Sequence, residues 1–142
     1  SNKFLRPLPV CLAIPTVRAM ALTILRTVRP SPTWQDSLII VMKGQRVVFD
    51  VEETWSPDMR DQIAWCGADG IFKHPAGDGY LLPGTNVGAL IACIGKGLPF
   101  AIGSRHDIIA HDEGTLFLAM NDHPEYNNQA GKVVAQVILF DE

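Results

Sequence analysis

The feature that most constrains this chain is a series of short segments in which every second residue is apolar. Between Arg46 and Glu52, for example, Val47, Phe49 and Val51 fall on one face of an extended chain. A period of two residues is that of a β-strand with one buried face. The chain also contains 12 Gly and 10 Pro among 142 residues, which suit short strands joined by frequent turns. The pattern therefore predicts an all-β chain with room for one compact domain.

The same signals place eight short strands along the chain. They are expected at residues 22–29, 38–42, 46–52, 89–94, 100–102, 107–110, 115–120 and 132–140. Residues 16–28 would also fit one face of a helix, but the prolines that follow at Pro30 and Pro32 favour a strand at 22–29. Both faces of 132–140 are apolar, which predicts a central strand. Such a series of strands is typical of an antiparallel jelly-roll-like β-sandwich.

Composition and charge exclude several classes of protein. The net charge of −3 argues against a nucleic-acid partner, and no apolar run reaches the 18 residues of a membrane span. The three cysteines form no disulfide framework and no CxxC pattern, which favours buried free thiols. The prolines at Pro7, Pro9 and Pro15 predict an extended arm at the N-terminus. We therefore expect residues 1–29 to form an arm with a first strand region, and residues 30–142 to form the main domain.

Two long loops lie between the predicted strands, at residues 54–88 and 121–131. Loops of this kind on a rigid scaffold commonly carry function. In the second loop, Asp122, Asn127 and Asn128 offer one carboxylate and two amide oxygens, and oxygen is the ligand that Ca²⁺ prefers. The alternative is a polar turn in which the same side chains bond to their own backbone. Trp55 and Trp65 in the first loop are candidates for stacking on a sugar or for anchoring the core.

The order of several short motifs resembles the calcium-dependent galactose-binding lectin family typified by the PA-I lectin of Pseudomonas (PA-IL-like domains). The matching pieces are Gly44-Gln45-Arg46-Val47, Trp55-Ser56-Pro57-Asp58, His74-Pro75, Gly88-Ala89-Leu90-Ile91 with Ile94-Gly95, and Asn121-Asp122 followed by Asn127-Asn128 and Gly131. The resemblance covers the chain from about Pro32 to Phe140. It implies a β-sandwich of the galactose-binding-domain type, within the main domain at residues 30–142.

The resemblance also implies a mechanism and a set of site residues. The side chains of Asp122, Asn127 and Asn128 would hold one Ca²⁺, with backbone carbonyls from near Asp58 and Glu125. Two neighbouring sugar hydroxyls would complete the shell of the ion, and Asp122 and Asn127 would contact the sugar as well. His74, Pro75 and Asp78 would contribute further sugar contacts. Glu125 lies in a loop shorter than that of the galactose-specific lectin, and Ala76-Gly77-Asp78 replace a Gln that follows the His-Pro pair there.

These implications lead to a functional expectation with two alternatives. We expect a non-enzymatic lectin whose partners are galactose or other hexose-containing glycans, either as a homo-oligomer or as a module of a larger protein, in an exported or extracellular setting. The first alternative is a structural or protein-interaction sandwich that has lost sugar binding. The second is a hydrolase that pairs Asp78 with another carboxylate such as Asp122, although neither HExxH nor GxSxG occurs in the chain. Ser104, His106 and Asp107 are too close in sequence, on an extended segment, to form a catalytic triad.

Overall fold

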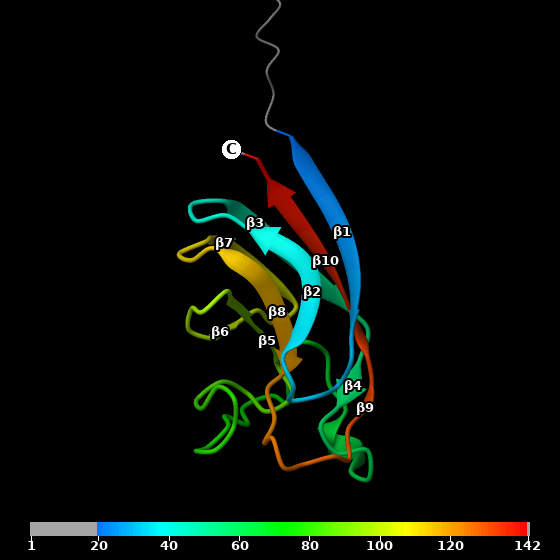
Figure 1. The fold of residues 1–142 in the computed structure, drawn as a ribbon. Coiled ribbons are helices and arrows are strands. Elements are labelled where there is room, and N and C mark those ends of the chain that lie inside the picture. The colour runs from blue at the N-terminus through cyan, green and yellow to red at the C-terminus, as the bar shows by residue number, and fades with distance from the viewer. Residues whose placement is uncertain (1–19, 142) are drawn as a thin grey trace, which may run out of the picture.

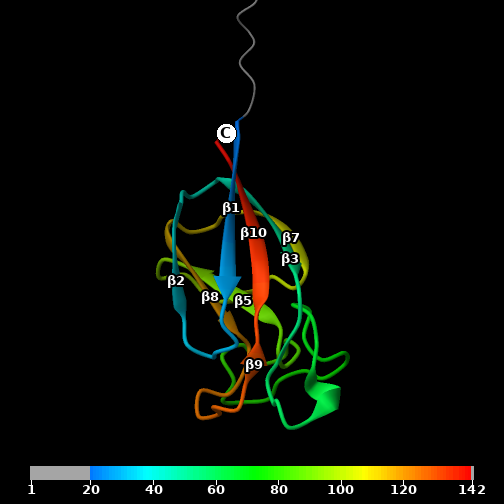
Figure 2. The same ribbon diagram turned by 90° about the vertical axis from the view of Figure 1, so that its right-hand side faces the viewer.

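The computed structural model describes residues 20–141, which form two facing antiparallel sheets (Figures 1 and 2). The first sheet has the order β1 (Ala21–Val28), β10 (Val133–Phe140), β3 (Arg46–Glu52) and β7 (Arg105–Ile109). The second has the order β2 (Gln35–Val41), β8 (Gly114–Met120), β5 (Leu90–Ile94) and β6 (Phe100–Ala101). A small third sheet pairs β4 (Trp55–Ser56) with β9 (Ala130–Gly131), and the 3-10 helix η2 (Gln62–Ala64) follows β4. The predicted all-β antiparallel sandwich is confirmed.

The core lies between the two large sheets and is made by the alternating apolar residues of the strands. In β10 the residues Val133, Ala135, Val137 and Leu139 are buried, while the residues between them are only half-buried. Strand β5 is buried along its whole length. Burying apolar surface at about 25 cal/mol per Å² makes this shared layer the main source of stability in the fold.

The eight predicted strands are all present, with bounds that differ by a few residues at most. The segment after Met20 is a strand and not a helix, and it pairs with β10 over its full length. Strand β10 lies between β1 and β3, as its two apolar faces predict. The division at residue 29 stays a prediction, because β1 is part of the sandwich sheet and residues 1–19, which hold the predicted arm, lie outside the described residues.

Strand β2 begins earlier than predicted because its first three residues, Gln35, Asp36 and Ser37, are polar. Its register against β8 shifts between Asp36 and Ile40, and Leu38 adopts φ 60° with its side chain 77% exposed. The Asp36 carboxylate accepts a hydrogen bond from the Leu38 N–H at 2.8 Å and holds this irregular turn of the backbone. The buried side chains still alternate along β2, at Ser37, Ile39 and Val41, so the apolar period finds only the half of the strand whose buried residues are apolar.

Two of the three cysteines lie within the described residues. Cys66 is half-buried and Cys93 is buried, and both are free thiols. Burial raises the pKa of the Cys66 thiol to about 11. Cys11 lies outside the described residues. Within residues 20–141, no helix has the length and the hydropathy that a membrane crossing requires.

The two long loops lie together at one end of the sandwich, away from the C-terminus (Figure 1). The short β4–β9 pairing holds them there, because β4 opens the first loop and β9 closes the second. Trp55 in β4 is fully buried, and its Nε1–H donates to the carbonyl of Gly88 at 2.7 Å, which fastens the far end of the first loop to the same point. The small sheet thus connects the two loops to the sandwich.

We predict that Gly131→Ala destabilises the protein by about 2–4 kcal/mol, because the backbone conformation would be strained for alanine and the added methyl group would be crowded. Gly131 has φ 83°, and its new Cβ would lie 2.8 Å from the Thr54 carbonyl oxygen and from the Trp55 Cα. Gly44→Ala is the matched control, since Gly44 has φ 89° and no atom within 4 Å of the new Cβ. We expect it to lose only about 1–2 kcal/mol. Urea unfolding measures both; equal losses would contradict the crowding at β9.

Candidate functional site

A cavity of about 470 Å³ opens among the loops at this end of the sandwich. Its walls are formed by Pro57, Asp58, Arg60, Asp61, Ala64, Ile71, His74, Tyr80, Val87, Asp122, Tyr126 and Asn128. Four of the residues that the sequence singles out are therefore neighbours around one cavity: Asp58, His74, Asp122 and Asn128. They come from three separate stretches of the chain, which the β4–β9 pairing and the bond from Trp55 to Gly88 bring to one place.

The other predicted site residues are not among those that form the walls. Asn127 and Glu125 lie in the same loop as Asn128, and their side chains are exposed. Pro75 pairs with Asn86 in an isolated β-bridge beside His74, and Asp78 is exposed two residues before Tyr80. Their assignment to a metal or a sugar stays a prediction.

Asp122 is the most deeply buried acid of the described chain, with 1% of its surface exposed. One carboxylate oxygen accepts the backbone N–H of His123 at 2.9 Å, and the other accepts Nε2 of Gln129 at 2.7 Å. Burial raises the pKa of Asp122, the two hydrogen bonds oppose that rise, and the nearby charge of Asp58 adds to it. Ionising Asp122 therefore costs more free energy in the folded protein than in water, and a cation beside it would lower that cost.

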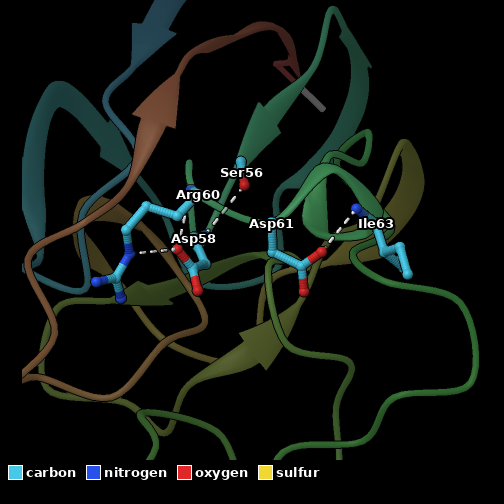
Figure 3. Close-up of polar contacts among 5 residues, drawn as sticks. All are labelled: Ser56, Asp58, Arg60, Asp61 and Ile63. Carbon is cyan, nitrogen blue, oxygen red and sulfur yellow. Dashed lines mark hydrogen bonds and ion pairs between the residues drawn. The ribbon is translucent and has the colours of Figure 1, made fainter.

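Asp58 is a second carboxylate at the cavity, and its own loop positions it (Figure 3). Its Oδ1 accepts the backbone N–H of Arg60 at 3.0 Å and the Arg60 Nε at 3.3 Å, while its N–H donates to Ser56 Oγ at 3.0 Å. The backbone hydrogen bond from Arg60 is the main cause of a lowered pKa at Asp58, so this carboxylate is ionised at neutral pH. Asp61 begins η2 by accepting the N–H of Ile63 at 3.0 Å.

A direct backbone contact joins the two loops at the cavity. The N–H of Met59 donates to the carbonyl oxygen of Asn128 at 2.9 Å. This bond connects the chain next to Asp58 with Asn128, and Asp58, Asp122 and Asn128 all line the same cavity. Within residues 20–141, His, Cys, Asp and Glu side chains form no group of three or more suited to a metal ion. A cation at this cavity would need the mixed set of carboxylate, amide and carbonyl oxygens that suits Ca²⁺.

Asn121 has a structural part in the site that sequence reasoning missed. It is fully buried, and its Nδ2 donates to the carbonyls of Leu82, Thr85 and Asn86 at 2.9, 3.0 and 3.3 Å. Its Oδ1 accepts the Leu82 N–H at 2.9 Å. One amide side chain thus holds the segment that runs from Tyr80 to the next strand, and its neighbour Asp122 is left to line the cavity. The sequence shows only adjacent polar residues at the end of a strand, with no sign of which one turns inward.

Aromatic residues are the other part of the site that sequence reasoning did not assign. Tyr80 and Tyr126 both line the cavity, and the ring of His123 contacts both of them. Trp55 is buried in the core, in accord with the structural alternative, whereas Trp65 is 43% exposed with its ring beside Gly131. Neither tryptophan is among the residues that line the cavity.

The Ser104, His106 and Asp107 group does not assemble into a triad. Ser104 bonds to Asp69, and Asp107 forms an ion pair with Arg46 at 2.8 Å.

Comparison with solved structures identifies the fold. A structure described as the "EclA N-terminal domain; PllA-like lectin" superposes with a TM-score of 0.63 and covers 81% of this chain and 94% of its own, at 16% sequence identity. The chain has the fold of a PllA-like lectin domain. A functionally unknown conserved protein from Bacillus anthracis str. Ames also matches, with a TM-score of 0.41, 16% identity and coverage of 82% of this chain and 21% of its own. No protein-family model and no curated protein match the chain.

The PllA-like fold agrees with the resemblance drawn from the short motifs of the sequence. At 16% identity the superposition demonstrates the fold alone, and any function depends on the residues of the cavity. In this lectin fold the cavity is formed by connections between strands, so its residues are free to differ while the sandwich is kept.

We predict that Asn121→Asp destabilises the ligand-free protein by about 2–4 kcal/mol, because a carboxylate would face three carbonyl oxygens with no hydrogen to donate. Asn127→Asp makes the same chemical change at an exposed position of the same loop and should alter the free energy of unfolding by less than about 0.5 kcal/mol. Urea unfolding in the presence of EDTA compares the two. Similar small effects of both substitutions would show that Asn121 does not hold the loop.

Proposed function

We propose that this protein is a non-enzymatic, calcium-dependent lectin that binds galactosides. The observation that carries the proposal is the convergence of Asp58, Asp122, Asn128 and His74 around one cavity, at the loop end of a PllA-like lectin fold. The cavity volume of about 470 Å³ is within the range of small-molecule sites and suits a ligand of monosaccharide size. Asp78, which a glycosidase would have to pair with Asp122, is not among the residues that line the cavity.

The donor set supports a hard cation. Asp122 supplies a buried carboxylate, Asn128 supplies an amide oxygen, and Asp58 adds negative charge and backbone oxygen nearby. Asn127 and the carbonyl near Glu125 belong to the same short loop and would complete the shell. When bound, Ca²⁺ would offer free coordination positions to two neighbouring sugar hydroxyls.

The residues around this position orient the sugar. Asp122 has oxygen lone pairs for a hydrogen bond from a hydroxyl that also approaches the cation. His74 lies at the exposed rim of the cavity, where either ring nitrogen can bond to a hydroxymethyl group. Pro75 and Asp78 border His74 and Tyr80 in sequence and would contact the parts of a glycan that extend beyond the first sugar. Weak single-site affinity would make a homo-oligomer or a multidomain setting useful, and exported lectins meet glycans outside the cell.

Isothermal titration of methyl β-galactoside into the calcium-loaded protein tests the proposal. We expect a Kd on the order of 0.1–1 mM, or about −4 to −5.5 kcal/mol, and no binding after EDTA treatment. Asp122→Asn should abolish both calcium and galactoside binding because it removes the buried negative charge. Asp107→Asn is the control, since it removes an equal charge from the exposed ion pair with Arg46 and should bind as the wild type does.

Three results would contradict the proposal, one each from the galactoside titration, a calcium titration and a turnover assay. Galactoside binding that survives chelation would exclude the calcium mechanism. Retention of calcium by Asp122→Asn would place the ion elsewhere. Turnover of a chromogenic galactoside would show that the site is catalytic.

Thermal unfolding provides a separate prediction for Asp122. Its pKa in the folded state is raised above the unfolded value, so its contribution favours folding below the unfolded pKa and is lost as the pH rises through the folded pKa. At pH 7 in EDTA, Asp122→Asn removes this buried charge but turns its amide nitrogen toward one of the two N–H donors, so its Tm should stay close to that of the wild type. Calcium at a hundredfold excess over its Kd should stabilise only the wild type, by about 2.7 kcal/mol. A clear loss of stability in Asp122→Asn without calcium would mean that Asp122 serves the fold.

A further inference from the structure

Two tyrosines from separate loops form a concave aromatic corner in the wall of the cavity. The rings of Tyr80 and Tyr126 lie with centroids 6.3 Å apart and planes at 85°, and both residues line the cavity together with His74 and Asp122. Tyr80 comes from the long first loop and Tyr126 from the loop that holds Asp122. The corner therefore exists only because the two loops meet at this end of the sandwich.

The corner is packed against the ring of His123. This ring contacts Tyr80 edge-on, with centroids 5.7 Å apart and planes at 89°, and lies against Tyr126 at 5.1 Å and 31°. Gly79 permits the close approach, because at φ 92° it turns the loop and a Cβ there would lie 2.9 Å from Nε2 of His123. A pre-formed aromatic surface loses little conformational entropy when a ligand binds to it.

Tyr126 contributes nothing to the buried core of the fold. Its side chain is 50% exposed, and it does not belong to the buried core cluster of the described residues. The rest of the cavity wall combines apolar residues such as Ile71 with charged groups such as Asp58, and the two tyrosines are, with His74, its aromatic residues. A half-exposed aromatic ring beside hydrogen-bonding groups is typical of a site for an amphipathic ligand.

Sugars are amphipathic in this way, and they differ in where their C–H groups lie. A pyranose with an axial 4-hydroxyl carries the hydrogens of C3, C4 and C5 on one face, which forms a continuous apolar patch. In the gluco configuration the equatorial 4-hydroxyl moves the C4 hydrogen to the opposite face and breaks that patch. The electron-rich face of an aromatic ring attracts the slightly positive C–H groups of such a patch. Vicinal hydroxyls on either sugar can approach a cation, so a cation alone discriminates poorly between the two.

We infer that Tyr80 and Tyr126 are the specificity-determining residues of the site, and that they select pyranoses of the galacto configuration by stacking against the C3–C5 face. The inference rests on the proposed function and deepens it. The cation and His74 hold the hydroxyl edge of the sugar, and the aromatic corner recognises its hydrocarbon face. Tyr126 contributes the more accessible ring, so its removal should have the larger effect.

Titration of Tyr126 variants tests this inference. We expect Tyr126→Ala to weaken binding of methyl β-galactoside by about fivefold to tenfold, to reduce the preference for methyl β-galactoside over methyl β-glucoside, and to leave the affinity for calcium alone within twofold. Tyr126→Phe keeps the ring and should retain both affinity and preference. Tyr126→Leu keeps an apolar side chain without a π face and should lose the preference. Because the residue is half-exposed, all three variants should unfold at about the wild-type temperature.

The outcomes separate the inference from the proposed function. If the calcium-loaded wild type binds no galactoside, the proposed function fails and the inference fails with it. If the wild type binds galactoside through calcium but Tyr126→Ala shows unchanged affinity and preference, the aromatic corner is not the specificity element and the proposed function stands. Loss of calcium binding in Tyr126→Ala would show that the ring supports the loop that holds Asp122, which also overturns the inference.

Discussion

The arrangement of the site depends on the burial of one residue, Trp55. Its backbone pairs with Gly131 on one side and with Cys66 on the other, and its indole N–H donates to the carbonyl of Gly88. Three parts of the chain that are distant in sequence therefore meet around one fully buried side chain. A buried indole that keeps its hydrogen bond contributes both a large apolar surface and a fixed orientation. Beyond this point the loops are ordered by isolated β-bridges and by single hydrogen bonds such as those of Asn121, so Trp55 determines where the loops begin and end.

Two adjacent residues at the end of strand β8 have different roles. Asn121 turns inward and bonds to the backbone of the neighbouring loop, while Asp122 lines the cavity and bonds to Gln129 within its own loop. A strand places successive side chains on opposite faces, so this division follows from the geometry of the preceding strand. The site is thus continuous with the sandwich, and the rigid end of β8 determines where its buried carboxylate lies.

The sequence predicts the strands well because each carries its own alternation, as in β3 and β10. It fails at the start of β2, because Gln35, Asp36 and Ser37 are polar and give no apolar alternation although they belong to the strand. The cavity is harder to predict, because His74 and Asp122 become neighbours only through contacts made by Trp55 and Asn121. The spacing of the two residues does not predict that they share a site, and only the resemblance to the lectin family does. No local pattern separates the anchoring amide of Asn121 from the exposed amide of Asn127, and nothing in the sequence pairs Tyr80 with Tyr126, since that contact depends on where two loops meet.

The residues that serve the proposed function are those that the fold itself does not favour. A carboxylate with 1% exposure and a raised pKa opposes folding at neutral pH, and a half-exposed tyrosine leaves apolar surface in water. The hydrogen bonds from His123 and Gln129 reduce the free-energy cost of burying the Asp122 carboxylate but leave its charge in place. Both features become favourable together only when a ligand brings positive charge to Asp122 and a hydrocarbon face to Tyr126. A cation with a coordinated sugar meets both conditions at once, whereas a cation alone would leave the aromatic corner exposed. Local conflicts of this kind in an otherwise consistent fold are concentrated at functional sites, and here they lie on the walls of a single cavity.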